Sequence, residues 1–141
     1  MTIEFQADAA RFGRAYEVQV ASWLKGNGFE IIGRNVRHES GVEFDILATS
    51  WTGEEVGVEC KASPDTATSP GMLRGDNRWK VLGYLYALNV WKQRTGKTVR
   101  YILITSHMPE PGTDQRRLLD LAELLGDLQI VVHPNAADRN P

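Results

Sequence analysis

The segment VEFDILATSWTGEEVGVECK, residues 42–61, decides the fold. Apolar and polar side chains alternate along residues 41–50 and again along 54–63, and this period of two predicts two β-strands. The connection WTGE is short and contains a glycine, which is typical of a β-hairpin. A hairpin that turns symmetrically about Thr52 places Asp45 opposite Glu59 and Glu43 opposite Lys61.

The polar face of this hairpin is predicted to concentrate charge. Three acids and one lysine would form a patch with four less polar residues buried behind it: Glu43, Asp45, Glu59 and Lys61 in front, and Phe44, Ile46, Val58 and Cys60 behind. Carboxylates whose Cβ atoms lie roughly 4.5–5.5 Å apart repel each other unless a cation lies between them. Such hard oxygen ligands favour Mg²⁺ or Mn²⁺, and a neighbouring lysine can stabilise the charge that develops in phosphodiester hydrolysis. The alternative is a solvated charge ladder in which Glu43 pairs with Lys61.

A predicted first helix, residues 8–25, adds another acid. Asp8 is a plausible N-cap, and the glycines of KGNGFE end the helix. Glu17 lies beside the apolar stripe of this helix and among small residues, so its carboxylate would be partly buried and would need a partner. That partner is either the acid patch or a nearby base, Arg14 or Lys25.

The remaining sequence supplies further strands and helices. The predicted elements are a strand over 29–36, a loop over 64–77, a helix over 78–96, a strand over 98–106, a helix over 115–127 capped by Asp114, and a strand over 128–134. The early strands form an antiparallel meander, and the late strand–helix–strand unit implies a parallel pair. The chain is therefore predicted to be an α/β protein with a mixed sheet and helices on both faces.

Together these residues resemble the PD-(D/E)XK nuclease superfamily. The likeness consists of a helix with a glutamate (GRAYE), an acid that ends a strand (GVEFD) and an E-x-K motif on the next strand (ECK), and it extends over about residues 10–105. Small archaeal-type Holliday-junction resolvases are the most similar members, through GRNVRHESGVEFDILA and VGVECKAS. The resemblance implies a restriction-endonuclease-like αβββαβ core and a magnesium-dependent DNA endonuclease, with Mn²⁺ able to substitute and without a small-molecule cofactor.

The resemblance also implies roles for individual residues. Asp45 and Glu59 would bind the metal together with the backbone carbonyl of Cys60, and Lys61 would orient or activate the attacking water. Glu17 would be a further ligand or an acid just behind the ligands. A weaker set of expected DNA contacts comprises Arg37, Ser40, Arg74, Arg78 and Lys80.

Composition and charge set the remaining expectations. The 141 residues are predicted to form a single nuclease domain, with a core over about 8–133 and a tail over 134–141. The start shows no secretory signal, no apolar run would span a bilayer, and the lone cysteine fits a reducing compartment, so we expect a cytoplasmic, nucleoid-associated protein without membrane contact.

The distribution of charge bears on the partner. The net charge is −2, but residues 70–100 hold seven basic side chains and one acid, which is compatible with a surface that faces DNA phosphates. A homodimer is expected from the resemblance and from the need to cut two strands. The alternatives are a restriction- or repair-type nuclease acting on duplex or single-stranded DNA, and a non-catalytic DNA-binding protein that keeps the fold.

Overall fold

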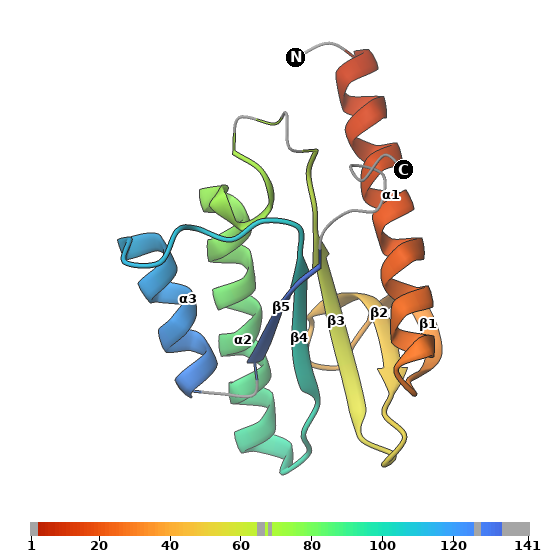
Figure 1. The fold of residues 1–141 in the computed structure, drawn as a ribbon. Helices are drawn as coiled ribbons and strands as arrows, with labels where there is room; N and C mark the ends of the chain where they lie inside the picture. The colour runs from red at the N-terminus through yellow and green to blue at the C-terminus, as the bar shows by residue number, and fades with distance from the viewer. Residues whose placement is uncertain (1–2, 65–66, 68, 126–127, 134–141) are drawn as a thin grey trace.

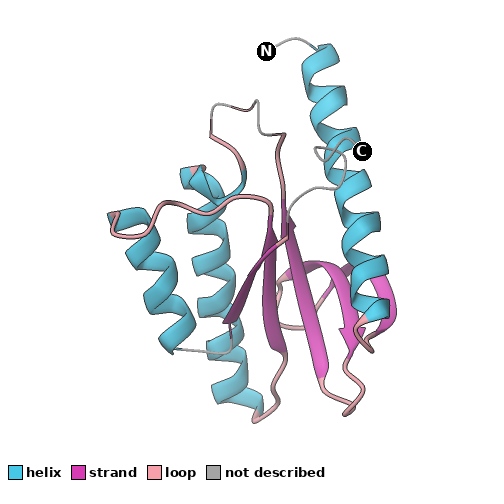
Figure 2. Ribbon diagram, viewed as in Figure 1, coloured by secondary structure: helices cyan, strands magenta, loops and turns pink. Residues whose placement is uncertain are grey.

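A five-stranded mixed sheet lies between helices in the computed structural model, which describes residues 3–64, 67, 69–125 and 128–133 (Figures 1 and 2). Its elements are α1 (Ile3–Gly26), β1 (Glu30–Arg37), β2 (Glu43–Thr49), β3 (Glu55–Lys61), the 3₁₀ turn η1 (Gly71–Leu73), α2 (Gly75–Thr95), β4 (Arg100–Thr105), α3 (Asp114–Leu125) and β5 (Leu128–Val132). The predicted α/β class and order of elements are confirmed. None of the helices in the described ranges is long and apolar enough to cross a membrane.

The strands lie in the sheet in sequence order, β1-β2-β3-β4-β5. β1, β2 and β3 pair antiparallel, as the predicted meander requires, and β4 pairs parallel with β5. β3 also pairs parallel with β4, so that α2 connects these two strands by crossing over the sheet. This topology puts the carboxyl ends of β3, β4 and β5 at one edge of the sheet, where their following loops gather.

Two apolar layers hold the helices against the sheet. On one face, α1 packs through Tyr16, Val20 and Leu24 against Val58 of β3, among other apolar residues. On the other face, α2 and α3 pack against a second apolar cluster that includes Tyr101 of β4 (Figure 1). The helices therefore cover both faces, as the sequence predicts.

The hairpin register agrees with the sequence-based prediction, but its side-chain pattern does not. Ile46 pairs with Val58 and Leu47 with Gly57, as a turn symmetric about Thr52 requires. Yet Phe44 joins the apolar cluster under α2, whereas Ile46 joins the cluster under α1. The predicted burial of Phe44 and Ile46 on one common face is therefore wrong.

A glycine permits this change of face. A Cβ atom built on Gly57 would lie 2.3 Å from Cε1 of Phe44, so only glycine leaves space for the phenyl ring against β3. The ring fills that space, and the alternation of side chains breaks between Phe44 and Ile46. Asp45 lies at this break, where β2 leaves its ladder with β3.

Several predicted boundaries need correction. α1 begins at Ile3, so Asp8 lies inside the helix and does not cap it. The predicted loop 64–77 contains η1, whose Met72 is fully buried, and α2 already begins at Gly75. The cap of α3 is Thr113, whose hydroxyl accepts a hydrogen bond from the Arg116 backbone N–H at 3.2 Å. The predicted tail 134–141 and the end of the predicted helix, 126–127, lie outside the described residues.

Candidate functional site

The predicted acids meet where β2 and β3 separate. The β2–β3 ladder ends at the pair Ile46–Val58, and beyond it Oδ2 of Asp45 accepts a hydrogen bond from the backbone N–H of Cys60 at 2.7 Å. This bond holds the Asp45 carboxylate beside the end of β3. Glu43 does not face Lys61 as predicted: it pairs with Arg37 of β1 instead, across 3.4 Å. The alternative of a Glu43–Lys61 charge ladder is therefore wrong.

Glu59 is the most buried charged side chain of the site, with only 1% of its surface exposed. Its Oε1 lies 3.2 Å from Nζ of Lys61 and 3.7 Å from Nζ of Lys80, which reaches down from α2. Its Oε2 is buried and has no hydrogen-bond partner among the described residues. A buried carboxylate oxygen without a partner is costly, so this oxygen marks a place where a donor or a cation would be stabilising.

Glu17 of α1 also lines the cleft, and its carboxylate already has a basic partner. Its Oε2 accepts a hydrogen bond from Arg34 of β1 at 3.0 Å, and 17% of the Glu17 side chain is exposed. The base in this ion pair is Arg34, and neither of the two partners proposed from the sequence, Arg14 and Lys25, takes that place. Since Arg34 neutralises Glu17, this glutamate is better suited to a place behind the metal ligands than among them.

Glu17, Asp45 and Lys61 line a cleft of about 350 Å³, whereas Glu59 is not among its lining residues. Asp45 and Lys61 reach it from the sheet, Glu17 from α1, and Arg74 and Asn77 from the start of α2. The full lining is Gly13, Tyr16, Glu17, Asp45, Cys60, Lys61, Ala62, Ser63, Arg74 and Asn77. A cleft with acids and a lysine on its floor and basic or amide groups on its rim is suited to a polyanionic substrate that binds through a cation.

Burial raises the pKa of both acids of the site. Burial, and next the negative charge of Glu59, raise the pKa of Asp45 to about 7, although the Cys60 N–H and Lys61 oppose the shift. Burial likewise raises the pKa of Glu59, against the lowering effect of Lys61 and Lys80. Burial also raises the pKa of the Cys60 thiol, so this sulfur is not an activated thiolate. Burial is thus the main cause of both carboxyl shifts, and it makes the ionised acids costly in the folded protein.

The donor set is suited to a hard divalent cation. The carboxylates of Asp45 and Glu59 and the carbonyl of Cys60 would supply oxygen ligands, and the partnerless Oε2 of Glu59 leaves one of them available. In the described ranges, no three His, Cys, Asp or Glu side chains form a ready-made metal cluster. Mg²⁺ keeps several waters and binds through one or two carboxylates plus phosphate oxygens, which is the environment that this site offers.

The expected DNA-contacting residues divide into two groups. Arg74 lines the cleft, and Lys80 contacts Glu59 inside the site. Arg78 does not reach the cleft, because its Nη1 donates to the carbonyls of Met72 and Leu73 and so caps η1. Arg37 and Ser40 lie in the β1–β2 hairpin, away from the residues that line this cleft.

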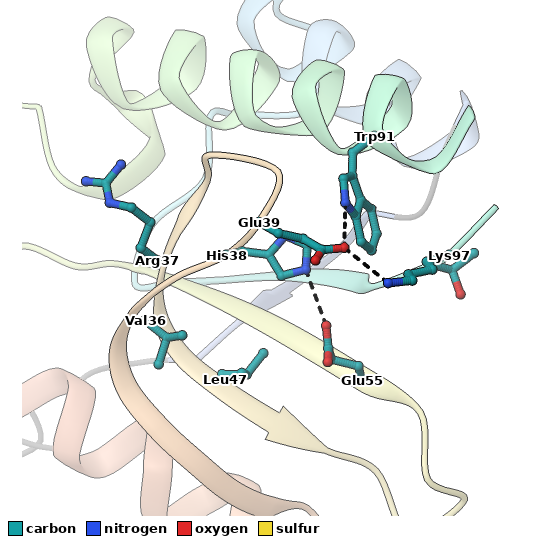
Figure 3. Close-up of a pocket in the computed structure, with 9 residues that line it drawn as sticks. Val36, Arg37, His38, Glu39, Leu47, Glu55, Trp91 and Lys97 are labelled. Atoms are coloured by element: carbon teal, nitrogen blue, oxygen red, sulfur yellow. Dashed lines mark hydrogen bonds and ion pairs between the residues drawn. The ribbon is translucent and has the colours of Figure 1, made fainter. Parts of the chain in front are cut away.

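Arg37 lines a second pocket of about 450 Å³ on the other side of the sheet from α1 (Figure 3). In this pocket the acids have partners. Nε2 of His38 lies 3.4 Å from Oε1 of Glu55, and Oε1 of Glu39 accepts a hydrogen bond from Nε1 of Trp91 at 3.0 Å (Figure 3). Lys97 lies 3.6 Å from the same Glu39 oxygen.

Reasoning from sequence missed Asn77, which lines the cleft, and Arg34, which pairs with the cleft residue Glu17. Arg34 was missed because the register of β1 shifts between Ile31 and Gly33, so that simple alternation does not predict which face Arg34 takes. Asn77 was missed because the helix was predicted to begin at residue 78. The glycine at position 75 and the acid at 76 are the signal for an earlier start.

Comparisons with known proteins give a family match and two matches of fold. The sequence profile of a family described as "Uncharacterised protein family UPF0102" matches residues 16–101, which include Glu17, Asp45, Glu59 and Lys61. A UPF0102 protein of Aquifex aeolicus (strain VF5) is 49% identical over 51 residues, which are 36% of this chain and 48% of that protein.

Two solved structures share the fold. A repair endonuclease from Pyrococcus abyssi superposes with a TM-score of 0.52 at 20% identity over 84% of this chain, and a complex of EndoMS with dsDNA superposes with a TM-score of 0.52 at 18% identity over 86%. These matches confirm the predicted restriction-endonuclease-like fold. The chain spans about half of the length of the relatives it matches, 46% of each solved chain and 48% of the Aquifex protein.

Proposed function

The chain belongs to the uncharacterised protein family UPF0102, and on this premise we propose that it is a metal-dependent DNA endonuclease that hydrolyses phosphodiester bonds. The observation that carries the proposal is the half-buried Asp45 and the buried Glu59 beside Lys61, with Asp45 and Lys61 lining an open cleft. Acids whose pKa is raised by burial destabilise a fold when they are ionised, and such groups are concentrated at functional sites.

The residues of the site would have different roles in catalysis. Asp45 and Glu59, with the Cys60 carbonyl, would hold Mg²⁺ or Mn²⁺, and the ion would supply electrostatic stabilisation of the phosphoryl oxygens and lower the pKa of a bound water. Lys61, already oriented by Glu59 at 3.2 Å, would position the attacking water or stabilise the charge that develops on phosphate. Arg34 would hold Glu17 in place behind this group.

The rim of the cleft would meet the nucleic acid. The Arg74 side chain is 60% exposed and lines the cleft with Asn77, where a phosphate backbone would reach both. That one fold neighbour was solved with dsDNA supports DNA as the partner. In finer detail, we propose that the enzyme prefers branched DNA. A homodimer would cut it, with each of its two sites cleaving one strand.

A cleavage assay tests this proposal. Labelled linear duplex, single-stranded and four-way-junction DNA of matched sequence would be incubated with the protein in Mg²⁺, in Mn²⁺ and in EDTA. We expect cleavage with either metal, none in EDTA, and loss of cleavage in Asp45→Ala and Lys61→Ala. Faster cleavage of the junction than of the duplex would support branched-DNA selectivity, and the reverse would favour the restriction- or repair-type alternative.

The non-catalytic alternative makes the opposite prediction. A protein that only binds DNA would shift labelled DNA in a gel without cutting any of the three substrates. Cleavage that persists unchanged in both variants would place the activity elsewhere and would contradict the proposed site.

A further inference from the structure

Two serines link the segments that follow β3 and β4, which leave the sheet at the same end (Figure 1). The backbone N–H of Ser63 donates to Oγ of Ser106 at 3.1 Å, and the backbone N–H of Ser106 donates to the carbonyl of Lys61 at 3.0 Å. Oγ of Ser106 also shares a hydrogen bond of 2.6 Å with Nδ1 of His107. Ser106 is 9% exposed and is not among the residues that line the cleft, so it is not placed to touch a substrate.

The same hydrogen-bond network continues to the 3₁₀ turn η1. Oγ of Ser63 accepts a hydrogen bond from the backbone N–H of Gly71, the first residue of η1, at 3.1 Å. On the β4 side, the carbonyl of His107 accepts a hydrogen bond from the backbone N–H of Met72 at 3.0 Å. η1 is therefore bonded to the segment after β3 through a serine side chain and to the segment after β4 through the backbone.

The contact between η1 and the end of β4 is close. Gly71 has a φ of 55°, and a Cβ atom built on it would lie 2.9 Å from Oγ1 of Thr105 and 3.0 Å from the backbone N and O atoms of His107. The left-handed backbone and the lack of space both favour glycine at this position. Packing of this kind fixes where η1 lies against the end of β4, and the serine hydrogen bonds fix where it lies against the segment after β3.

η1 leads directly into the rim of the cleft. Arg74 follows η1 and Asn77 lies in the first turn of α2, and both residues line the cleft. The carbonyl of Gly71 accepts hydrogen bonds from Nδ2 of Asn77 at 2.9 Å and from the backbone N–H of Arg74 at 3.3 Å. Nε of Arg74 donates to Asp76 at 2.8 Å, which uses one of the five N–H donors of the guanidinium. The placement of both rim residues therefore depends on Gly71, which Ser63 binds.

We propose that Ser63 and Ser106 are positioning residues for DNA binding, which hold Arg74 and Asn77 at a fixed place relative to Lys61. This inference rests on the proposed function, because it assigns the rim of that same cleft to the phosphate backbone. A rim that is already held in place loses less conformational entropy when it binds DNA. The affinity for DNA should therefore depend on two serine hydroxyls, one of which lies outside the cleft.

The chemical step should depend much less on these hydroxyls. The backbone N–H of Ser106 binds the Lys61 carbonyl, and this N–H remains when the side chain is replaced by that of alanine. The ammonium group of Lys61 is held by Glu59, whose Oε1 lies 3.2 Å from Nζ. Loss of a serine hydroxyl should therefore loosen the rim and leave Lys61 in its place.

Single-turnover cleavage at increasing protein concentration tests the proposal, because it separates the concentration that gives half of the maximal rate from the maximal rate itself. Ser63→Ala and Ser106→Ala should each raise that concentration about fivefold and change the maximal rate less than about threefold. Ser63→Thr keeps a hydroxyl and should restore most of the affinity. Ser50→Ala is the matched control, because Oγ of Ser50 accepts the Glu54 N–H at 3.0 Å in the β2–β3 turn, and it should change neither quantity.

A double-mutant cycle separates positioning from a general loss of stability. Arg74→Ala should raise the half-maximal concentration about tenfold, and Ser106→Ala added to it should raise that concentration less than about twofold further, because the residue that the serine positions is already absent. Effects that multiply in full would show that Ser106 acts independently of Arg74 and would overturn the proposal. Far-ultraviolet circular dichroism checks that each variant is folded, and Ser63→Ala carries the same cycle if Ser106→Ala does not fold.

Fluorescence anisotropy of labelled DNA gives a measurement that does not depend on cleavage. A wild type whose DNA affinity falls in both alanine variants, but which cuts no substrate, would support the positioning role and contradict only the nuclease. Equal affinity of the wild type and both variants would overturn the positioning role even if cleavage is confirmed. A wild type that binds none of the three DNA substrates would overturn both proposals.

Discussion

β3 has a glutamate at each end, and their surroundings differ. Glu55 begins the strand, has a side chain that is 49% exposed, and pairs with His38. Glu59 lies near its end, is 1% exposed, holds two lysines at one oxygen and has no described partner at the other. The first lines a pocket whose acids have partners, and the second raises the pKa of Asp45, which lines the cleft together with Lys61. Uncompensated burial distinguishes a site prepared for a ligand from a stable polar surface.

Removal of the lysine at the uncompensated end should have the largest effect. Lys61→Ala deletes the group that would orient the water or stabilise the developing charge, so the cleavage rate should fall by about 10²- to 10⁴-fold. Rates on the preferred DNA under single-turnover conditions measure this change. A fall of less than tenfold would remove Lys61 from the chemistry.

The free-energy cost of burying the ionised Asp45 carboxylate gives a prediction for the stability of the fold. Burial, followed by the charge of Glu59, raises the pKa of Asp45 from 3.8 to about 7 in the folded protein. A raised carboxyl pKa means that the folded state favours the protonated acid, so this contribution to stability is present below about pH 4 and is lost as the pH rises through 7. Asp45→Asn removes the charge and keeps an acceptor for the Cys60 N–H.

In EDTA at about pH 8, Asp45→Asn should therefore unfold with a free energy higher than that of the wild type by roughly 1–3 kcal/mol. The difference should disappear near pH 4, where both side chains are neutral. Urea denaturation at the two pH values measures it. A variant that is less stable than the wild type at the higher pH would show that Asp45 is not an uncompensated charge.

Lys80 should have an intermediate effect. It contacts Glu59 at 3.7 Å but is 45% exposed, so solvent screens the interaction. Lys80→Ala should lower the cleavage rate about tenfold by loosening Glu59, and Lys80→Arg should restore part of that loss. The matched control is Arg78→Ala, because Arg78 caps η1 and does not touch the acids. Equal effects of the two alanine substitutions would show that Lys80 acts only through the stability of α2.

The smallest effect is expected in the pocket of Figure 3. Lys97 is 67% exposed and pairs with Glu39 across 3.6 Å. Lys97→Ala should change the free energy of unfolding by no more than about 0.5 kcal/mol and the cleavage rate by less than twofold. A large loss of cleavage here would show that the second pocket takes part in the reaction.

The sequence was sufficient for the fold and for the central residues of the site. Alternating side chains predicted the hairpin, and the positions of Thr52 and Gly53 set its register, which the pairs from Ile46–Val58 to Thr49–Glu55 confirm. Residues fixed by local periodicity in this way can be inferred from a single chain. The geometric clustering of Asp45, Glu59 and Lys61 follows from that register, and their roles remain predictions.

Details set by contacts distant in sequence could not be inferred. The change of face at Phe44 depends on the space above Gly57, 13 residues away, and the partner of Glu17 depends on a register shift in β1. The buried Met72 lies in a segment rich in proline, glycine and serine, whose composition indicates a loop. In each case tertiary packing overrides the local pattern.

The most direct test of the account compares the two ends of β3. Glu59→Gln and Glu55→Gln each remove one negative charge from the same strand without changing the side-chain size appreciably. Mg²⁺-dependent cleavage of DNA should fall by at least about 100-fold in Glu59→Gln and by less than twofold in Glu55→Gln, with both variants folded. Equal rates in the two variants, or full activity in Glu59→Gln, would contradict the claim that the buried acids beside Lys61 form the site of a nuclease.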